Sequence, residues 1–312
     1  TPKIKKKISI FCDVEEEAVI TGLDVDSVYK IPIVFDDEGV GRIVSKILDV
    51  KRRNGNVAEW KKLIENWENA KRTITIAMCG KYTDLEDSYA SINEALMHCG
   101  AHLNAKVKIK FIETTHTDKV ASQLEGVDGV IVPGGFGGRG IEGKIEAVKV
   151  CREKNVPFLG LCYGLQMAVI EFARNVCGLE GANTTEVDNK TKHPVIAILE
   201  EQKDITTKGA TMRLGAYPAK IEKGTKVHAL YKSDNVSERH RHRYEVNPKY
   251  HKILSDKGLV FSGMSPDRKL VEFIELPDHK YFIGTQAHPE LKSSLPKPAP
   301  LFYGFIKACL EK

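Results

Sequence analysis

The sequence predicts an α/β protein with an open, mainly parallel central sheet and helices on both faces. From residue 73 onward, short apolar runs typical of buried strands alternate with helical stretches. The connections are short and contain glycine, as in βαβ units. One apolar run also ends in a Gly-x-Cys-x-Gly turn followed by a helix. Such an elbow exposes its central residue at the carboxyl edge of a parallel sheet.

The individual elements can be assigned in order. Strands are expected at 73–80, 106–112, 128–133 and 156–161, and helices at 88–99, 141–152 and 163–175. Residues 106–112 alternate Lys with Val, Ile and Phe, which predicts a half-buried strand. Beyond Pro194 the apolar runs become shorter and strand-like, until a last helix at 301–310.

The first 72 residues have a different pattern. Residues 1–48 alternate short apolar runs with acidic turns and lack the length for a core of their own. Residues 49–72 are charged and polar, but Trp60, Leu63, Ile64 and Trp67 form one apolar helical face. We therefore expect three parts: 1–48, a linker with a docked helix at 49–72, and one large domain at 73–312.

Composition excludes several classes of protein. The net charge of +5 is too small and too scattered to predict a nucleic-acid surface. Seven cysteines without a CxxC pair predict neither a disulfide framework nor a zinc site, and we expect no metal. The basic N-terminus leads into an apolar run, 8–11, that is too short for a signal peptide or membrane span. We expect a cytoplasmic protein without a membrane partner.

The turn around Cys162 is the strongest chemical signal. Gly160 and Gly164 flank it at two residues on either side, which lets strand and helix approach without Cβ clashes. The start of the following helix favours a thiolate, and the backbone N–H of Tyr163 points to where an oxyanion would form. The alternative is a buried cysteine between two packing glycines.

A cysteine nucleophile needs a base and a residue that orients the base. His288 and Glu290 follow a strand-like run at 281–285, and the intervening proline stiffens their spacing. The glycine-rich run 134–140 follows another strand and offers backbone N–H groups as a second oxyanion donor, although it also fits a simple loop. A near match to a phosphate-binding P-loop ends at Lys144, but an isoleucine follows where Ser or Thr would bind Mg²⁺.

With these residues assembled, the chain resembles the class I (triad-type) glutamine amidotransferases, and within them the C-terminal part of the CTP synthase family. The broad resemblance rests on PGGFG (133–137), GLCYGLQ (160–166) and HPE (288–290). The narrower one rests on FCDV (11–14), DVDSVYKIP (24–32), TMRLG (211–215) and ERHRHRYEVN (238–247).

The resemblance implies a flavodoxin-like sheet and a domain that hydrolyses L-glutamine to glutamate and ammonia without a cofactor. It implies that 1–48 is the end of a synthetase (amidoligase) domain, whose main part, with its ATP and Mg²⁺ sites, is absent from this sequence. In the intact enzyme the ammonia would aminate UTP to CTP, GTP would activate the glutaminase, and the chains would form a homotetramer.

The resemblance also assigns roles to single residues, matched by motif. The triad would be Cys162, His288 and Glu290. Glutamine would be bound by Gly135, Tyr163, Gly164, Leu165, Gln166, Glu186 and Arg243. Of these, Glu186 would bind the α-amino group and Arg243 the α-carboxylate, which suits their charges. Lys7 and Val25 match positions that contact the pyrimidine nucleotide and the ATP adenine.

One residue departs from the family pattern, because Tyr163 stands where leucine is usual after the nucleophile. Its backbone N–H is unaffected, but its bulk can alter access for glutamine. Arg213 would lie near a GTP-responsive interface or would be an ordinary surface arginine. Arg239 to Arg243 would be part of the motif, a solvated face or a polyanion patch.

Two other functions stay open on the sequence alone. A different thiol hydrolase, such as a γ-glutamyl hydrolase or a cysteine peptidase, would use a similar sheet and triad. It would not need Glu186 and Arg243 to hold both charged ends of a free amino acid. A non-catalytic assembly or regulatory module would not need the triad, yet all three residues are present.

Overall fold

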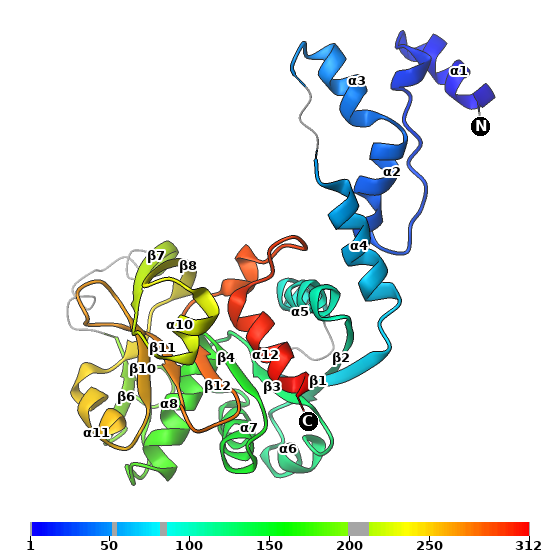
Figure 1. Cartoon of the computed structure of the whole chain (residues 1–312). Helices are drawn as coiled ribbons and strands as arrows, with labels where there is room; N and C mark the ends of the chain where they lie inside the picture. Colours follow the sequence, from blue (N-terminus) through cyan, green and yellow to red (C-terminus); the bar gives the residue numbers. More distant parts are fainter. Residues whose placement is uncertain (1, 52–54, 82–85, 199–211, 312) are drawn as a thin grey trace. The chain divides into compact units, whose positions relative to one another are not determined.

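A computed structural model describes residues 2–51, 55–81, 86–198 and 212–311. The chain divides into two compact units, Thr1–Asn69 and Ala70–Lys312 (Figure 1). The first residue of the TMRLG motif, Thr211, lies outside the described residues. The expected three-part division at 1–48, 49–72 and 73–312 stays a prediction.

The first unit contains short helices. They are α1 (Pro2–Cys12), α2 (Ile31–Asp37), α3 (Val40–Ile47) and α4 (Val57–Glu68), with two 3-10 turns at Glu16–Ala18 and Val28–Lys30. Asn56 caps α4, because its side chain accepts a hydrogen bond from the backbone N–H of Glu59. Trp60 donates its indole N–H to the Tyr29 carbonyl at 2.7 Å, and the two rings lie 6.1 Å apart. The predicted amphipathic helix is therefore present and packs within this unit.

The second unit is organised around a nine-stranded sheet of order β2-β1-β3-β4-β12-β11-β10-β7-β8. Its strands in chain order are β1 (Arg72–Gly80), β2 (Ala105–Glu113), β3 (Gly129–Val132), β4 (Phe158–Leu161), β7 (Arg213–Ile221), β8 (Asn235–His242), β10 (Val260–Met264), β11 (Val271–Glu275) and β12 (Phe282–Thr285). The predicted α/β class is confirmed, and the predicted strands at 73–80, 106–112, 128–133 and 156–161 match β1 to β4 closely.

The sheet has two halves that differ in strand direction. All pairings among β2, β1, β3, β4 and β12 are parallel. All pairings from β12 through β11, β10, β7 and β8 are antiparallel. The mainly parallel sheet expected from the sequence is therefore a mixed sheet, because the short strand-like runs beyond Pro194 extend it with antiparallel strands.

Helices cover both faces of the sheet (Figure 1). One face packs against α5 (Ala90–Leu103), α10 (Lys226–Tyr231) and α12 (Pro300–Leu310), and the other against α6 (Thr117–Gln123), α7 (Ile141–Lys154) and α8 (Tyr163–Asn175). In the parallel strands the side chains alternate between these cores: Ile76 and Met78 of β1 face the first, and Ala77 and Cys79 the second.

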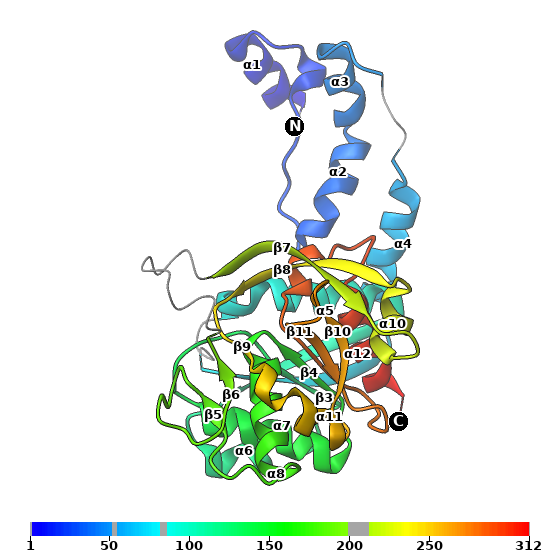
Figure 2. The ribbon, with the colours of Figure 1, turned by 90° about the vertical axis from the view of Figure 1, so that its left-hand side faces the viewer.

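A second, three-stranded sheet stands beside α8. Its order is β5-β6-β9, formed by β5 (Asn183–Thr184), β6 (Pro194–Ala197) and β9 (Glu245–Val246), and the short helix α11 (His251–Asp256) follows it (Figure 2). β9 comes directly after the long β7–β8 pair, so the end of β8 is joined to both sheets. Within the part of the chain that the structure describes, no helix has the length and apolarity to cross a membrane.

Candidate active site

Cys162 occupies the sharp turn between β4 and α8. Its backbone angles, φ 52° and ψ −97°, are rarely adopted by a residue with a side chain, and such strain is typical of functional positions. The flanking glycines are required by packing. A Cβ on Gly160 would lie 2.7 Å from the Gly164 carbonyl carbon, and a Cβ on Gly164 would overlap the carbonyl oxygen of Val132. The predicted elbow is therefore present.

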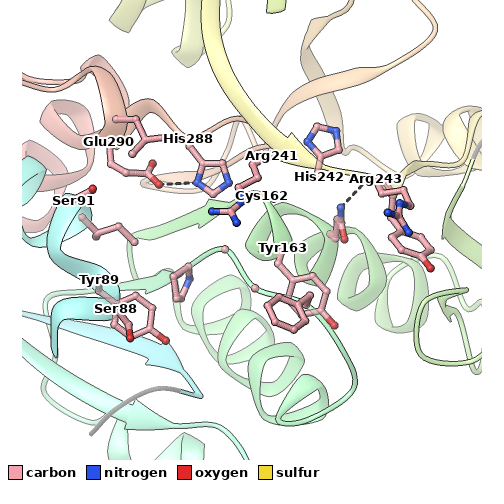
Figure 3. Close-up of a pocket in the computed structure, with 18 of the residues that line it drawn as sticks. Ser88, Tyr89, Ser91, Cys162, Tyr163, Arg241, His242, Arg243, His288 and Glu290 are labelled. Carbon is pink, nitrogen blue, oxygen red and sulfur yellow. Dashed lines mark hydrogen bonds and ion pairs between the residues drawn. The ribbon is translucent and has the colours of Figure 1, made fainter. Parts of the chain in front are cut away.

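The candidate base comes from the segment that follows β12. The backbone N–H of Cys162 donates to the Thr285 carbonyl at 2.7 Å, which ties the turn to the end of this strand. Three residues further on, the His288 ring faces Glu290, with Nδ1 and Oε1 2.7 Å apart (Figure 3). The backbone N–H of His288 donates to the Arg239 carbonyl at 2.7 Å, so β8 also fixes this segment.

The environment of His288 favours its protonated form. Burial opposes the positive charge, but hydrogen bonds to Cys162 and Glu290, and their negative charges, outweigh it and raise the pKa of His288 to about 10. The imidazole is therefore coupled to the sulfur on one side and to a carboxylate on the other. A protonated His288, bonded to Cys162 and Glu290, is the state that this arrangement favours at neutral pH.

The glycine-rich loop after β3 is held from two sides. The Tyr163 hydroxyl donates to the Gly137 carbonyl at 2.7 Å, and the Gly137 N–H donates to Glu186 Oε1 at 3.0 Å. Burial, and then the charge of Glu186, raise the pKa of Tyr163 well above its usual range, so the phenol stays a donor. The unusual tyrosine thus points toward the loop that contains Gly135.

The P-loop-like match at Lys144 has a different explanation. The side chain is 1% exposed, and its ammonium group lies 5.0 Å from the Tyr163 ring centroid. Burial, and then the charge of Lys81, lower the pKa of Lys144 to about 8. Lys144 therefore packs beneath the glycine-rich loop, in the core, and is not placed as the lysine of a phosphate-binding loop would be.

These groups surround one cavity of about 910 Å³, a volume within the usual range for small-molecule sites. Its wall contains most of the predicted residues: Gly135, Cys162, Tyr163, Gln166, Glu186, Arg243, His288 and Glu290. Figure 3 shows Tyr163 on the helix side of the cavity and Arg241, His242 and Arg243 on the segment that ends β8. A carboxylate and a guanidinium thus belong to the same cavity as the sulfur.

Two predicted ligands of glutamine lie beneath the cavity and not in its wall. In the first turn of α8, the backbone of Gly164 packs against the Val132 carbonyl, and the side chain of Leu165 is fully buried in the core. Neither residue is among those that line the cavity, and the expected contact of Gly164 and Leu165 with glutamine stays a prediction. Lys7 is exposed on α1 and Val25 is half-buried, both in the first unit, and their nucleotide contacts stay predictions.

A buried charge network joins the antiparallel half of the central sheet to β9 of the second sheet. Arg213 donates to Glu272 at 2.6 Å and to Glu245 at 3.3 Å. His240 contacts the other oxygen of Glu272 at 2.7 Å, and His242 contacts Glu245 at 2.8 Å. Arg213 is only 8% exposed, so the alternative of an ordinary surface arginine is wrong.

The basic run 239–243 follows the alternation of a strand. The side chains of His240 and His242 are buried in the network, whereas those of Arg239 and Arg241 are exposed. This division explains why histidines and arginines alternate in the motif. A uniform solvated face is therefore the wrong description of the run.

The sequence prediction missed Gln286. It is fully buried directly after β12, and its side-chain nitrogen lies 3.7 Å from the sulfur of Cys162. The available signal was a polar side chain directly after a buried strand and two residues before the candidate base. Among the described residues, no group of three or more His, Cys, Asp or Glu side chains is placed to hold a metal ion.

Comparison with known proteins defines the class. The chain belongs to the class-I glutamine amidotransferase family, whose model matches residues 84–308. A second family model, described as the N-terminus of CTP synthase, matches residues 1–50.

Curated relatives are similar along almost the whole chain. CTP synthases of Methanococcus maripaludis and Methanocaldococcus jannaschii are 52% and 51% identical to it, over 99% of its length. The chain spans about three fifths of those relatives, 60% and 58% of their lengths. A solved structure, the glutaminase domain of Trypanosoma brucei CTPS with bound acivicin, is 37% identical with a TM-score of 0.72. That likeness covers 77% of this chain and 94% of the trypanosome one.

Proposed function

We propose that the second unit hydrolyses L-glutamine to glutamate and ammonia through a thioester on Cys162. The observation that carries this proposal is one cavity that holds a cysteine on a strained elbow, a His288–Glu290 pair 2.7 Å apart, and Glu186 with Arg243. Membership of the amidotransferase family and the likeness to a CTPS glutaminase domain support it.

In the first half-reaction, the thiolate of Cys162 attacks the side-chain carboxamide carbon of glutamine. A C–S bond forms, and the carbonyl π electrons move to oxygen, where the N–H groups of Gly135 and Tyr163 stabilise the negative charge. The oxyanion then collapses, the C–N bond breaks, and the protonated His288 gives its proton to the leaving nitrogen. Ammonia departs and a thioester remains.

In the second half-reaction, the now neutral His288 takes a proton from water as the water oxygen attacks the thioester carbon. The C–S bond breaks, glutamate leaves, and the thiolate and imidazolium are restored. Glu290 keeps Nδ1 protonated and fixes the ring plane throughout, as the orienting carboxylate does in serine and cysteine triads. Neither half-reaction requires a cofactor.

The charged residues of the cavity suit a free amino acid. Glu186 offers a carboxylate to the α-ammonium group, and Arg243 offers a planar pair of donors to the α-carboxylate. Because Glu186 also accepts the Gly137 N–H, the residue that recognises the substrate is bonded to the loop that contains the oxyanion donor. A peptide would lose at least one of these charged contacts.

For the intact protein we propose a cytoplasmic, glutamine-dependent CTP synthase. The similarity to relatives named CTP synthase and the match at residues 1–50 support this. The ammonia would pass to a synthetase domain that aminates UTP with ATP and Mg²⁺, GTP would activate the glutaminase, and the enzyme would assemble as a homotetramer. Lys7 and Val25 would then belong to its nucleotide sites.

The test is glutamate release from glutamine by this chain, with and without GTP. Replacing Cys162 by Ser is expected to abolish release and to prevent labelling by a glutamine-like electrophile. Cys12→Ser is the matched control, because Cys12 is exposed and lies in the first unit. Unchanged turnover in the Cys162 variant, or hydrolysis of peptides but not of free glutamine, would overturn the proposal.

A further inference from the structure

We propose that Gln286 is a positioning residue that donates a hydrogen bond to the sulfur of Cys162 and holds it as an oriented thiolate. This inference rests on the proposed function, because it concerns the same nucleophile. It adds a contact on the sulfur beyond the one from His288. The contact is part of a chain of side-chain amides that ends at the backbone beside Arg243.

Gln286 is fixed by the strand from which it comes. It follows β12 directly, is fully buried, and its backbone N–H donates to the Glu272 carbonyl at 2.9 Å. Its neighbour Thr285 accepts the backbone N–H of Cys162 at 2.7 Å. The short segment just before His288 is therefore hydrogen-bonded to both the backbone N–H and the sulfur of Cys162.

The hydrogen-bond pattern determines which end of the Gln286 amide faces the sulfur. The side chain of Gln166 faces the Tyr244 carbonyl at 2.9 Å, and since a carbonyl only accepts, this atom must be the NH₂ group. The same NH₂ group lies 3.3 Å from the Gln286 side chain, which must therefore present its oxygen there. The Gln286 NH₂ group is left facing Cys162 Sγ, at 3.7 Å.

A donor in this position acts mainly on the charged form of the sulfur. A thiolate accepts a hydrogen bond more strongly than a thiol does, because charge assists the bond. In a buried site the amide also replaces water that the sulfur has lost. Gln286 would thus increase the fraction of reactive thiolate and limit its rotation. Through Gln166, it also connects the sulfur to the segment that binds the substrate carboxylate.

The experiment measures alkylation of Cys162 by iodoacetamide, which joins carbon to sulfur with loss of iodide, as a function of pH. Gln286→Met removes the donor at similar length. Gln286→Glu keeps the shape and the bond from Gln166 but places an oxygen against the sulfur. We expect Gln286→Met to slow alkylation at neutral pH about tenfold, the usual value of one hydrogen bond to a charged group. The midpoint of the pH profile should rise by about one unit, and Gln286→Glu should be slower still.

The exposed Cys12, followed in the same samples by peptide mass spectrometry, is the internal standard. Its alkylation rate should not change. Glutamine turnover should show the same pattern, with kcat reduced about tenfold and KM changed less than about twofold, since the contact is not with substrate. A purely structural role would lower the unfolding midpoint of both variants and leave the alkylation profile in place.

Wild-type alkylation profiles in both variants, measured under conditions where they are folded, would overturn the proposal. Because alkylation needs no glutamine, the two proposals fail separately. An inactive wild-type chain with shifted profiles in the variants would contradict the proposed function alone. An active wild-type chain with unshifted profiles would contradict only the role of Gln286.

Discussion

The two halves of the central sheet contribute different things to the site. The parallel half, β2 to β12, supplies Cys162, the glycine-rich loop and, just after β12, His288. The antiparallel half, β11 to β8, supplies Arg243 and a set of buried charges centred on Arg213. The proposed reactive groups thus come from turns at the ends of parallel strands, and the proposed contact with the α-carboxylate comes from the end of a strand pair that contains a buried ion network.

The difference lies in how each half tolerates polarity. Strands β1, β3, β4 and β12 of the parallel half are packed with apolar side chains on both faces, and the proposed reactive groups lie in the turns at their ends. The antiparallel half and the adjoining β9 bury a network of charged or titratable side chains: Arg213, His240, His242, Glu245 and Glu272. Such a network is stable only if its members stay paired. Substitutions in the two halves should therefore differ in how they change activity and stability.

The largest effect is expected in the parallel half, on rate and not on folding. His288→Asn removes the proposed base and should lower kcat for glutamate release about 10⁴-fold, as in other triads. The raised pKa of His288 means that its stabilising contribution is complete below about 6.5 and is lost as pH rises through about 10. The stability–pH curve of the variant, followed by chemical denaturation, should be flatter across that range. A curve that runs parallel to that of the wild type would contradict the protonated state assigned to His288.

The next effect is expected in the antiparallel half, on folding. Arg213→Met leaves Glu245 and Glu272 buried without their shared cation, which typically costs about 3–5 kcal/mol. Burial opposes ionisation of Glu272, but His240 and Arg213 hold its pKa below the usual value. Without Arg213 the pKa of Glu272 is no longer held as low, and its ionised form loses stabilisation. The variant should therefore be least stable, relative to wild type, near neutral pH, where Glu272 is ionised. Denaturant midpoints at several pH values check this, and an unchanged free energy of unfolding would remove the distinction between the halves.

A smaller effect is expected on substrate binding. Arg243→Met should raise KM for glutamine about 10- to 100-fold, since one charged, bidentate contact is lost. Arg243→Lys should recover only part of this, because a lysine keeps the charge and loses the planar pair of donors. Steady-state kinetics on both variants separate charge from geometry. Equal KM values for the two variants and wild type would contradict recognition of the α-carboxylate by this half.

The smallest effect is an expected gain of stability in the parallel half. Lys144→Met removes a buried ammonium whose pKa is lowered from 10.5 to about 8. Between those values the unfolded chain binds more protons, so wild-type stability rises with pH there. The variant should be more stable by about 1–3 kcal/mol below pH 8, with the gain fading toward 10.5. Thermal unfolding at several pH values tests this, and a loss of stability at neutral pH would mean that the contact with Tyr163 outweighs burial.

The sequence alone predicted the parallel half well and the antiparallel half poorly. Strands 73–80 and 156–161, and the helix after Cys162, follow from apolar periodicity and glycine turns, which are local signals. The charge network does not follow, because Arg213 pairs with Glu272, 59 residues away, and only strand pairing brings them together. The secondary-structure propensity of a segment contains no information about partners so far away in the chain.

By itself, the sequence determined the α/β class, the elbow at Cys162 and the pairing of a histidine with a carboxylate two residues later. Each depends on neighbours in the chain, where sterics and spacing suffice. Tertiary structure decided which polar groups meet: it placed Gln286 against the sulfur, Lys144 under Tyr163, and Gly164 and Leu165 below the cavity. The physical reason is that a hydrogen bond or buried charge depends on distance in space, which the order of residues does not specify.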